Sequence, residues 1–322
     1  MTSSCFNYIE PVFGGRNSRI FRLVKNKNIY GLKFFRKEAN NARDRLNAET
    51  SALDLFAKNG IECVPKLVAI DRVNNCILLE WINGQRVTDF RVKDINLISD
   101  FVQAVHDIYL KFNCDEIRFA TDACVNGAEI VCQINRRLEK LKLSYDKHPE
   151  LEKFIRSDFV PAFHKILDWS KNKYMKSDLN FDRDISPEQM TLSPVDIGLH
   201  NCLRTENKLY FLDFEFFGRD DPVKLVADTL QHPGSSFNQK DSDYLKIKFQ
   251  KIYDIDHQFQ VRLKCLYPLF GLKWCMIMLN PFLLRYVLKD HTRKKEIQKE
   301  QLVRVKLRTE RLVKITKNNY AW

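Results

Sequence analysis

The stretch LSPVDIGLHNCLRTENKLYFLDFEFFG, residues 192–218, raises the question that decides how the whole chain is interpreted. Three short polar residues, Asp196, Asn201 and Asp213, stand among leucine, isoleucine, valine and phenylalanine in a segment typical of buried strands and turns. Burying a carboxylate in apolar surroundings is costly unless a cation compensates its charge. The stretch therefore predicts cations beside these side chains.

A short hairpin is expected inside this stretch. The runs CLR (202–204) and LYFLD (209–213) read as strands joined by a polar turn. The hairpin brings Asn201, at its start, toward Asp213, at its end. Oxygen ligands of this kind suit Mg²⁺. The remaining carboxylate, Asp196, can then orient and deprotonate an attacking hydroxyl group.

Two charges in the first third of the chain stand where apolar residues are expected. Lys33 lies inside the apolar strand YGLKFF, and Glu49 falls on the helix face marked by Leu46 and Leu53. A charge on the packed face of a helix is unusual unless it is paired. We therefore predict that Lys33 and Glu49 pair with each other.

The run FGGRNSRIF, residues 13–21, precedes the strand that carries Lys33 by one hairpin. Glycines such as Gly14 and Gly15 let the backbone approach a ligand closely and offer amide donors to phosphate oxygens. The sequence thus contains a phosphate-approaching turn, a lysine, oxygen ligands for a metal and a candidate base. These are the parts that phosphoryl transfer from a nucleotide requires.

The order of the expected elements predicts a small strand-rich lobe followed by a large helical lobe. Gly60 is expected just past the end of the first helix, and Asn41 at its start. The expected strands are 18–24, 28–35, 64–71 and 76–82, and the expected helices are 41–58, 95–113, 126–143, 150–176, a buried pair within 274–288 and a final helix over 291–317.

The composition is that of an ordinary globular protein, with 44% hydrophobic and 29% charged residues among 322. The first 15 residues show neither a basic start nor an apolar core, so we expect no signal peptide. Nine cysteines without metal-ligand spacing indicate reduced thiols and a cytoplasmic location. We interpret Cys202 as a buried packing residue rather than a nucleophile.

The net charge of +12 is concentrated at the C-terminus. Residues 291–318 hold ten basic and three acidic side chains, a net charge of +7. We predict a solvated amphipathic helix, whose apolar stripe comprises Ile297, Leu302, Val305, Leu312 and Ile315. Weak contact with an acidic membrane surface stays open. No motif indicates nucleic-acid binding, and the apolar run 274–288 is too short and too interrupted for membrane insertion.

The motifs SPVDIGLHN and FLDFEFFGRDDPVKLVAD resemble those of the aminoglycoside phosphotransferase and choline kinase-like family, relatives of the protein kinases. The resemblance covers nearly the whole chain. It implies an α+β, bilobal protein kinase-like fold, with a small antiparallel-sheet N-lobe that carries one helix and a large helical C-lobe. The implied boundaries are 1–80 for the nucleotide-binding N-lobe, 81–85 for the hinge and 86–322 for the C-lobe.

The resemblance also implies roles for individual residues. Asp196 would be the catalytic base, Asn201 and Asp213 would bind Mg²⁺, Lys33 would contact the α- and β-phosphates, and Glu49 would orient Lys33. The turn at Gly14, Gly15, Asn17 and Ser18 would cover the phosphates of ATP or GTP. Backbone groups of Glu80 and Ile82, in LLEWING, would hold the edge of the base.

The chain departs from the family pattern at two positions. Pro194 replaces a histidine that usually stands two residues before the catalytic aspartate, and Glu215 stands where protein kinases have glycine. We interpret His200, beside Asn201, as a packing or hydrogen-bonding residue rather than a second base. Asp221 and Asp228 are interpreted as structural.

Several acceptors remain open. Too few residues follow Asp213 to form the activation segment of a protein kinase, which favours a small molecule. The basic C-terminus argues against a polycationic antibiotic and favours a neutral or anionic hydroxyl compound, such as a sugar or sugar derivative. The alternatives are an aminoglycoside, choline or another amino alcohol, and a non-catalytic pseudokinase that only binds nucleotide.

Overall fold

The computed structural model describes residues 7–12, 18–36, 44–89, 91–112, 114–206, 208–235, 237–284, 286, 288 and 290–317. The chain divides into two compact units built from interleaved segments. Unit 1 comprises Met1–Thr121, Thr191–Arg219 and Ser236–Leu245, and unit 2 comprises Asp122–Met190, Asp220–Ser235 and Lys246–Trp322. The lobe boundaries expected at residues 81–85 stay a prediction.

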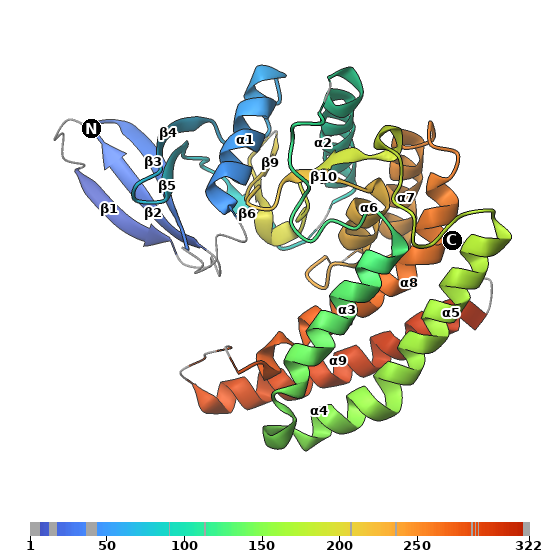
Figure 1. The fold of residues 1–322 in the computed structure, drawn as a ribbon. Coiled ribbons are helices and arrows are strands. Elements are labelled where there is room, and N and C mark those ends of the chain that lie inside the picture. Colours follow the sequence, from blue (N-terminus) through green and yellow to red (C-terminus); the bar gives the residue numbers. More distant parts are fainter. Residues whose placement is uncertain are drawn as a thin grey trace. The chain divides into compact units, whose positions relative to one another are not determined.

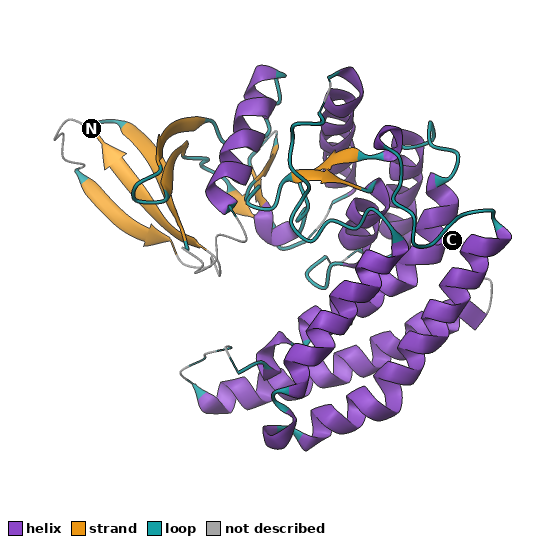
Figure 2. Cartoon of the chain, viewed as in Figure 1, coloured by secondary structure: helices purple, strands orange, loops and turns teal. Residues whose placement is uncertain are grey.

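A five-stranded antiparallel sheet forms the first part of unit 1 (Figures 1 and 2). Its order is β1-β2-β3-β5-β4, so the hairpin of β2 and β3 occupies the interior. Asn26 takes φ 56° in the turn between these two strands, which confirms the predicted hairpin. The strands are β1 (Tyr8–Val12), β2 (Ser18–Lys25), β3 (Asn28–Phe35), β4 (Leu67–Asp71) and β5 (Cys76–Glu80).

Helix α1 (Arg45–Lys58) packs on one face of this sheet. Leu46 of α1 forms a buried cluster with Phe35 of β3 and Ile77 of β5. The helix begins later than the sequence suggested, because Asp44 caps it by accepting a hydrogen bond from the Asn47 amide. Residues 41–43 lie outside the described part of the chain. Gly60, with φ 72°, lies just past the helix end, as predicted.

A second sheet and an aromatic cluster complete unit 1. The sheet has the order β6-β8-β9, from β6 (Gln85–Arg86), β8 (Cys202–Arg204) and β9 (Leu209–Phe211), and thus contains the predicted hairpin. Helix α2 (Val92–Lys111) contributes Phe101, which stacks on Phe211 of β9 with ring centroids 4.2 Å apart. Phe56 of α1 meets Phe101, Phe214 and Phe217 edge-on. The cluster joins α1, α2 and the segment after β9.

Unit 2 is helical. Helix α8 (Phe259–Met278) packs against α3 (Gly127–Lys142), α5 (Val160–Lys176), α6 (Pro222–Gln231) and α9 (His291–Lys317). Helix α4 (Pro149–Phe154) continues through one π-helical turn, Ile155–Phe159, into α5. Helix α7 (Gln239–Ile252) begins in unit 1 and ends in unit 2, and the short strands β7 (Thr191–Ser193) and β10 (Gly218–Asp220) pair with each other.

The prediction of a helix pair within residues 274–288 was wrong. Helix α8 ends at Met278 and is followed by a single 3-10 turn, Asn280–Phe282. Pro281 explains the stop, because proline has no N–H to continue the helical hydrogen bonds. The described residues from Leu283 to Leu288 form no helix. None of the helices in the described ranges has both the length and the apolar character needed to cross a bilayer.

The predicted amphipathic C-terminal helix is confirmed as α9. Leu302, Val305 and Leu312 of the predicted stripe are buried, whereas Ile297 and Ile315 are only half-buried. Buried polar side chains share that face, namely Gln298, Thr309 and Thr316.

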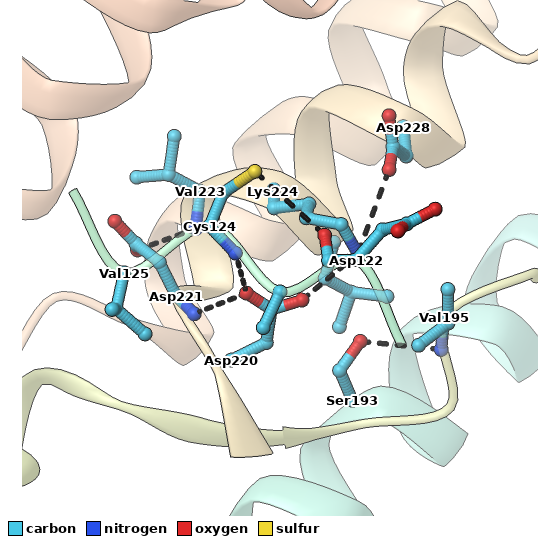
Figure 3. A network of polar contacts seen from close by, with 12 residues as sticks. Asp122, Cys124, Val125, Ser193, Val195, Asp220, Asp221, Val223, Lys224 and Asp228 are labelled. Atoms are coloured by element: carbon cyan, nitrogen blue, oxygen red, sulfur yellow. Dashed lines mark hydrogen bonds and ion pairs between the residues drawn. The ribbon is translucent and has the colours of Figure 1, made fainter. Parts of the chain in front are cut away.

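A buried charge network anchors the start of α6 (Figure 3). Lys224 donates to the Asp220 carboxylate at 2.8 Å and lies 3.8 Å from that of Asp228. The backbone amides of Cys124 and Asp221 also donate to Asp220. Burial raises the pKa of Asp220 above its ordinary value, although Lys224 opposes that shift. These contacts agree with the structural interpretation of Asp228.

Replacing Lys224 with methionine is expected to lower the free energy of unfolding by about 3–5 kcal/mol, because it leaves a fully buried carboxylate without its cation. Lys58→Met is the matched control. Lys58 and Asp54 form the same Lys–Asp pair at i,i+4 spacing, at 2.7 Å, but with 70% and 58% exposure instead of 2% and 0%. The control should lose less than about 1 kcal/mol. Urea denaturation measures the free energy of unfolding of both variants. Equal losses would contradict the structural role of the buried pair Lys224–Asp220.

Candidate active site

Lys33 lies at the centre of the candidate site, within unit 1. It occupies the middle of β3, opposite Ile20 of β2 and Ile77 of β5. Its Nζ atom contacts Glu49 Oε2 at 2.5 Å and Asp213 Oδ1 at 2.6 Å. The predicted pairing with Glu49 is confirmed. The additional contact shows that residues 180 positions apart in the sequence meet at one ammonium group.

The two carboxylates share one cation, and this arrangement shifts the pKa values of Lys33 and Glu49. Burial by itself lowers the pKa of Lys33, but Glu49 and Asp213 outweigh that effect and hold the pKa above its ordinary value. Burial raises the pKa of Glu49 to about 7, against the opposing effect of Lys33, and the Asp213 charge adds to the increase. Lys33 is therefore firmly charged, and Glu49 takes up a proton more readily than an ordinary glutamate.

A further ion pair links helix α1 directly to the segment after β9. Arg45, one turn before Glu49 on α1, lies with its Nε atom 3.9 Å from Glu215 Oε1, and both side chains are buried. Helix α1 thus meets the segment after β9 directly through Arg45 and Glu215, and indirectly through Lys33 of β3, which contacts both Glu49 and Asp213. The sequence analysis did not predict this pair. The available signal was a second charge, Arg45, four residues from Glu49 and therefore on the same helix face.

The loop that carries Asp196 and Asn201 is fixed by local hydrogen bonds. The side-chain amide of Asn201 donates to the Asp196 carbonyl at 3.1 Å, and the Asn201 carbonyl accepts from the Leu212 amide at 2.9 Å. The second bond ties the loop to the residue just before Asp213. With its nitrogen engaged, Asn201 offers its amide oxygen as the atom that can bind a cation.

The backbone before Asp196 is strained. Val195 has φ 69°, a conformation that is exceptional for a β-branched residue. The Asp196 amide donates to the Pro194 carbonyl across it, which gives Pro194 to Asp196 the form of a tight γ-turn. Asp213 also takes φ 69°. Strain of this kind concentrates at functional sites, where surrounding contacts maintain it.

Asp196 is accessible and has a polar neighbour. Its side chain is 28% exposed, and Oδ2 lies 3.2 Å from Nε2 of His200. His200 is 50% exposed, so it acts as a hydrogen-bonding residue and not as a packing residue. Asp213 is 33% exposed. Both carboxylates can therefore meet a ligand from solvent, whereas Glu49 cannot.

The residues present fit a magnesium ion. Asn201 and Asp213 offer an amide and a carboxylate oxygen, the donor types that Mg²⁺ prefers. The cluster of Lys33, Glu49 and Asp213 also carries one more negative charge than positive when all three are ionised, and a cation would compensate it. When bound, Mg²⁺ supplies charge neutralisation to the phosphates of a nucleotide.

The other predicted ligand residues are less fully described. Gly14, Gly15 and Asn17 lie outside the described residues, and Ser18 begins β2 opposite Phe35. The Glu80 amide donates to the Lys66 carbonyl, and the Ile82 carbonyl accepts from the Gly84 amide. The Glu80 carbonyl and the Ile82 amide are thus the backbone groups to consider for a base. Burial raises the pKa of Cys202 to about 12, so Cys202 is no nucleophile.

Comparison with known proteins gives the fold. No protein-family model and no curated protein sequence matches the chain. Solved structures match over nearly its whole length. A spectinomycin phosphotransferase in complex with ADP and spectinomycin has a TM-score of 0.62 at 14% identity, covering 95% of this chain and 94% of its own. The chain has a protein kinase-like fold.

Two further solved structures have a similar fold. A choline kinase of Streptococcus pneumoniae has a TM-score of 0.59 at 16% identity, covering 96% of this chain and 93% of its own. An ethanolamine kinase of Plasmodium vivax has a TM-score of 0.57 at 11% identity, with coverages of 92% and 82%. These similarities confirm the predicted fold class and the fold-level resemblance to aminoglycoside phosphotransferases and choline kinases.

A buried histidine supports the strand that leads into the Asp196 loop. His106 of α2 lies with Nδ1 3.0 Å from Thr191 Oγ1 of β7. Burial lowers the pKa of His106 from 6.5 to about 4. A depressed histidine pKa means that the unfolded chain takes up a proton before the folded one does. The stabilisation is therefore complete above pH 6.5 and decreases as the pH falls from 6.5 toward 4.

We expect His106→Gln to remove part of the acid sensitivity of the protein. Between pH 7 and pH 5, His106 should account for a loss of about 2 kcal/mol in the free energy of unfolding. Urea denaturation of wild type and variant at both pH values measures the difference. His164→Gln, at an exposed position on α5, is the control. An equal loss in wild type and His106→Gln would show that His106 does not titrate in this way.

Proposed function

We propose that this chain is a phosphotransferase that moves the terminal phosphoryl group of ATP or GTP to a hydroxyl group of a small molecule. The observation that carries the proposal is the sharing of Lys33 between Glu49 and Asp213, in the same unit as Asp196 and Asn201. This arrangement provides a fixed cation for phosphates, oxygen ligands for a metal and an accessible carboxylate. The ADP-bound relative in fold supports a nucleotide as co-substrate.

Each residue of the site has its own role in the proposed reaction. Lys33, held by Glu49, would bind phosphate oxygens, and Asn201 and Asp213 would hold Mg²⁺. Asp196 would accept the proton of the acceptor hydroxyl while that oxygen attacks the γ-phosphorus. The bond from the γ-phosphorus to the bridging oxygen breaks, and the nucleoside diphosphate leaves with the electron pair. His200 would help to orient the Asp196 carboxylate through their contact.

The acceptor is proposed to be a small hydroxyl compound. Helix α6 begins at Pro222, so the chain between Asp213 and α6 is too short to form a peptide-docking segment. The exposed basic side chains of α9 favour a neutral or anionic acceptor, such as a sugar or sugar derivative. The second candidate is an aminoglycoside or an amino alcohol, which the spectinomycin, choline and ethanolamine enzymes of similar fold favour.

We propose an N-lobe of residues 1–80, a hinge at 81–85 and a C-lobe of 86–322, with Gly14, Gly15, Asn17 and Ser18 over the phosphates. A cytoplasmic location, weak contact of α9 with an acidic membrane surface and the absence of nucleic-acid binding stay predictions.

Asp196→Asn is expected to reduce turnover roughly 10²- to 10⁴-fold, because it removes the proton acceptor while preserving the shape of the side chain. Nucleotide affinity should be retained. Nucleoside diphosphate release is measured with ATP and GTP against a panel of sugars, amino alcohols and aminoglycosides. The acceptor that stimulates wild type decides between the two candidate classes. Asp54→Ala, at an exposed position on α1, is the control. Equal turnover in Asp196→Asn and wild type would refute the assigned base.

Asp213→Ala is expected to weaken Mg-nucleotide binding by about tenfold or more, because it removes a charged metal ligand. Isothermal titration calorimetry with a non-hydrolysable ATP analogue measures the affinity with and without Mg²⁺. Asp71→Ala, at the end of β4, serves as the control. Unchanged affinity in the presence of Mg²⁺ would remove the metal role of Asp213, and nucleotide binding without turnover in wild type would indicate the pseudokinase alternative.

A further inference from the structure

The backbone of residues 118–121 runs alongside residues 216–219, which follow Asp213 by a few positions. Three backbone hydrogen bonds of 2.9 to 3.0 Å connect the two segments, and their pairs are Ala120 with Arg219, Thr121 with Phe216, and Arg219 with Arg118. Phe119 and Arg219 also form an isolated parallel bridge. The chain that follows Asp213 is thus held by a neighbouring extended segment.

Gly218 shows how closely these two segments are packed. A Cβ atom on Gly218 would lie 2.4 Å from the Ala120 amide nitrogen and 2.5 Å from the Arg118 carbonyl oxygen. No side chain fits at such distances from backbone atoms, so the close approach requires glycine. Residues 118–121 and the chain after Asp213 therefore form one closely packed unit of backbone.

The side chain of Arg118 extends from this segment to the start of α1. Its Nη1 atom donates to the Asp44 carbonyl at 3.1 Å, and its Nη2 atom donates to Thr121 Oγ1 at 3.3 Å. Asp44 is the residue that caps α1. Hydrogen bonds from a charged donor stabilise more than neutral ones. Arg118, oriented by Thr121, thus ties the start of α1 to residues 118–121.

The two carboxylates that contact Lys33 are consequently held by the same segment. Glu49 lies on α1, whose start is bonded to Arg118, and Asp213 precedes the chain that is bonded to the backbone of residues 118–121. Lys33 contacts both carboxylates at 2.5 and 2.6 Å, so a small shift of α1 would break one of the two contacts. Displacements of about 1 Å in an active site can cost about 100-fold in rate.

We propose that Arg118 is a positioning residue that holds Glu49 at the correct distance from Asp213 and thereby places the Lys33 ammonium group for a nucleotide. The proposal rests on the proposed function, because it takes Lys33 as the group that binds phosphates. Arg118 acts through Asp44 and helix α1, so it is not a catalytic residue.

The affinity for a nucleotide separates this role from a purely structural one. Thermal unfolding gives the Tm of each variant, and isothermal titration calorimetry with a non-hydrolysable Mg-ATP analogue is carried out well below it. Nearly all molecules are then folded, so a change in Kd reports the geometry of the site. A purely structural role would lower Tm and leave Kd unchanged.

The variants are Arg118→Met, Glu49→Gln and the combination of the two. The matched control is Arg72→Met. Arg72 is exposed and also donates to the first turn of α1, at the side chain of Asn47, but it follows β4 and has no place in residues 118–121. Thr121→Val removes only the hydroxyl group that orients the Arg118 guanidinium, and it is the milder variant should Arg118→Met fail to fold.

We expect Arg118→Met to weaken binding of the Mg-ATP analogue about tenfold, and Thr121→Val about threefold. In the Glu49→Gln background the added effect of Arg118→Met should be less than about twofold, because residues that act through one another are not additive. Arg72→Met should match wild type.

Three results would overturn the role of Arg118 and leave the proposed function intact. They are an unchanged Kd in Arg118→Met, the same loss with Glu49 and with Gln at position 49, and an equal loss in Arg72→Met. If Arg118→Met did not fold, an unchanged Kd in Thr121→Val would overturn the role instead. Failure of wild type to bind any Mg-nucleotide would refute the proposed function, and this proposal with it.

Discussion

One ammonium group shared by two carboxylates is the interaction on which the candidate site depends. Lys33 is buried, so its charge has to be compensated within hydrogen-bonding distance, and Glu49 and Asp213 provide that compensation from distant parts of the chain. The same contact fixes the distance between the β3 strand, the α1 helix and the segment after β9. Removing Lys33 would leave the buried Glu49 carboxylate without its cation, whereas removing one carboxylate would leave Lys33 paired with the other.

The apolar scaffold makes this contact geometrically possible. Phe56 of α1 packs against Phe101 of α2 and against Phe214, the neighbour of Asp213. The aromatic cluster thus holds the helix that bears Glu49 against the segment that bears Asp213. The unfavourable backbone at Val195, which precedes Asp196, is held by local hydrogen bonds, from the Val195 amide to Ser193 Oγ and from the Asp196 amide to the Pro194 carbonyl.

Regular local patterns were readable from the sequence, and irregular ones were not. The β2–β3 hairpin and the amphipathic helix α9 follow from alternation and helical periodicity, which act over a few residues. The helix pair expected within residues 274–288 was wrong, because α8 ends at Met278 and only a 3-10 turn that contains Pro281 follows it. The start of α1 was predicted too early, because the periodic pattern did not reveal that Asp44 caps the helix through the Asn47 amide.

The amino-acid sequence alone indicated which charged residues need a partner. Lys33, Glu49 and the carboxylates of residues 192–218 stand in apolar surroundings, and a charge there requires a partner wherever the chain goes. Which partners meet follows from the packing of the folded chain. The contact of Lys33 with Asp213, that of Arg45 with Glu215 and that of Arg118 with the Asp44 carbonyl join residues far apart in sequence. No local periodicity encodes such contacts, because they depend on how strands and helices pack.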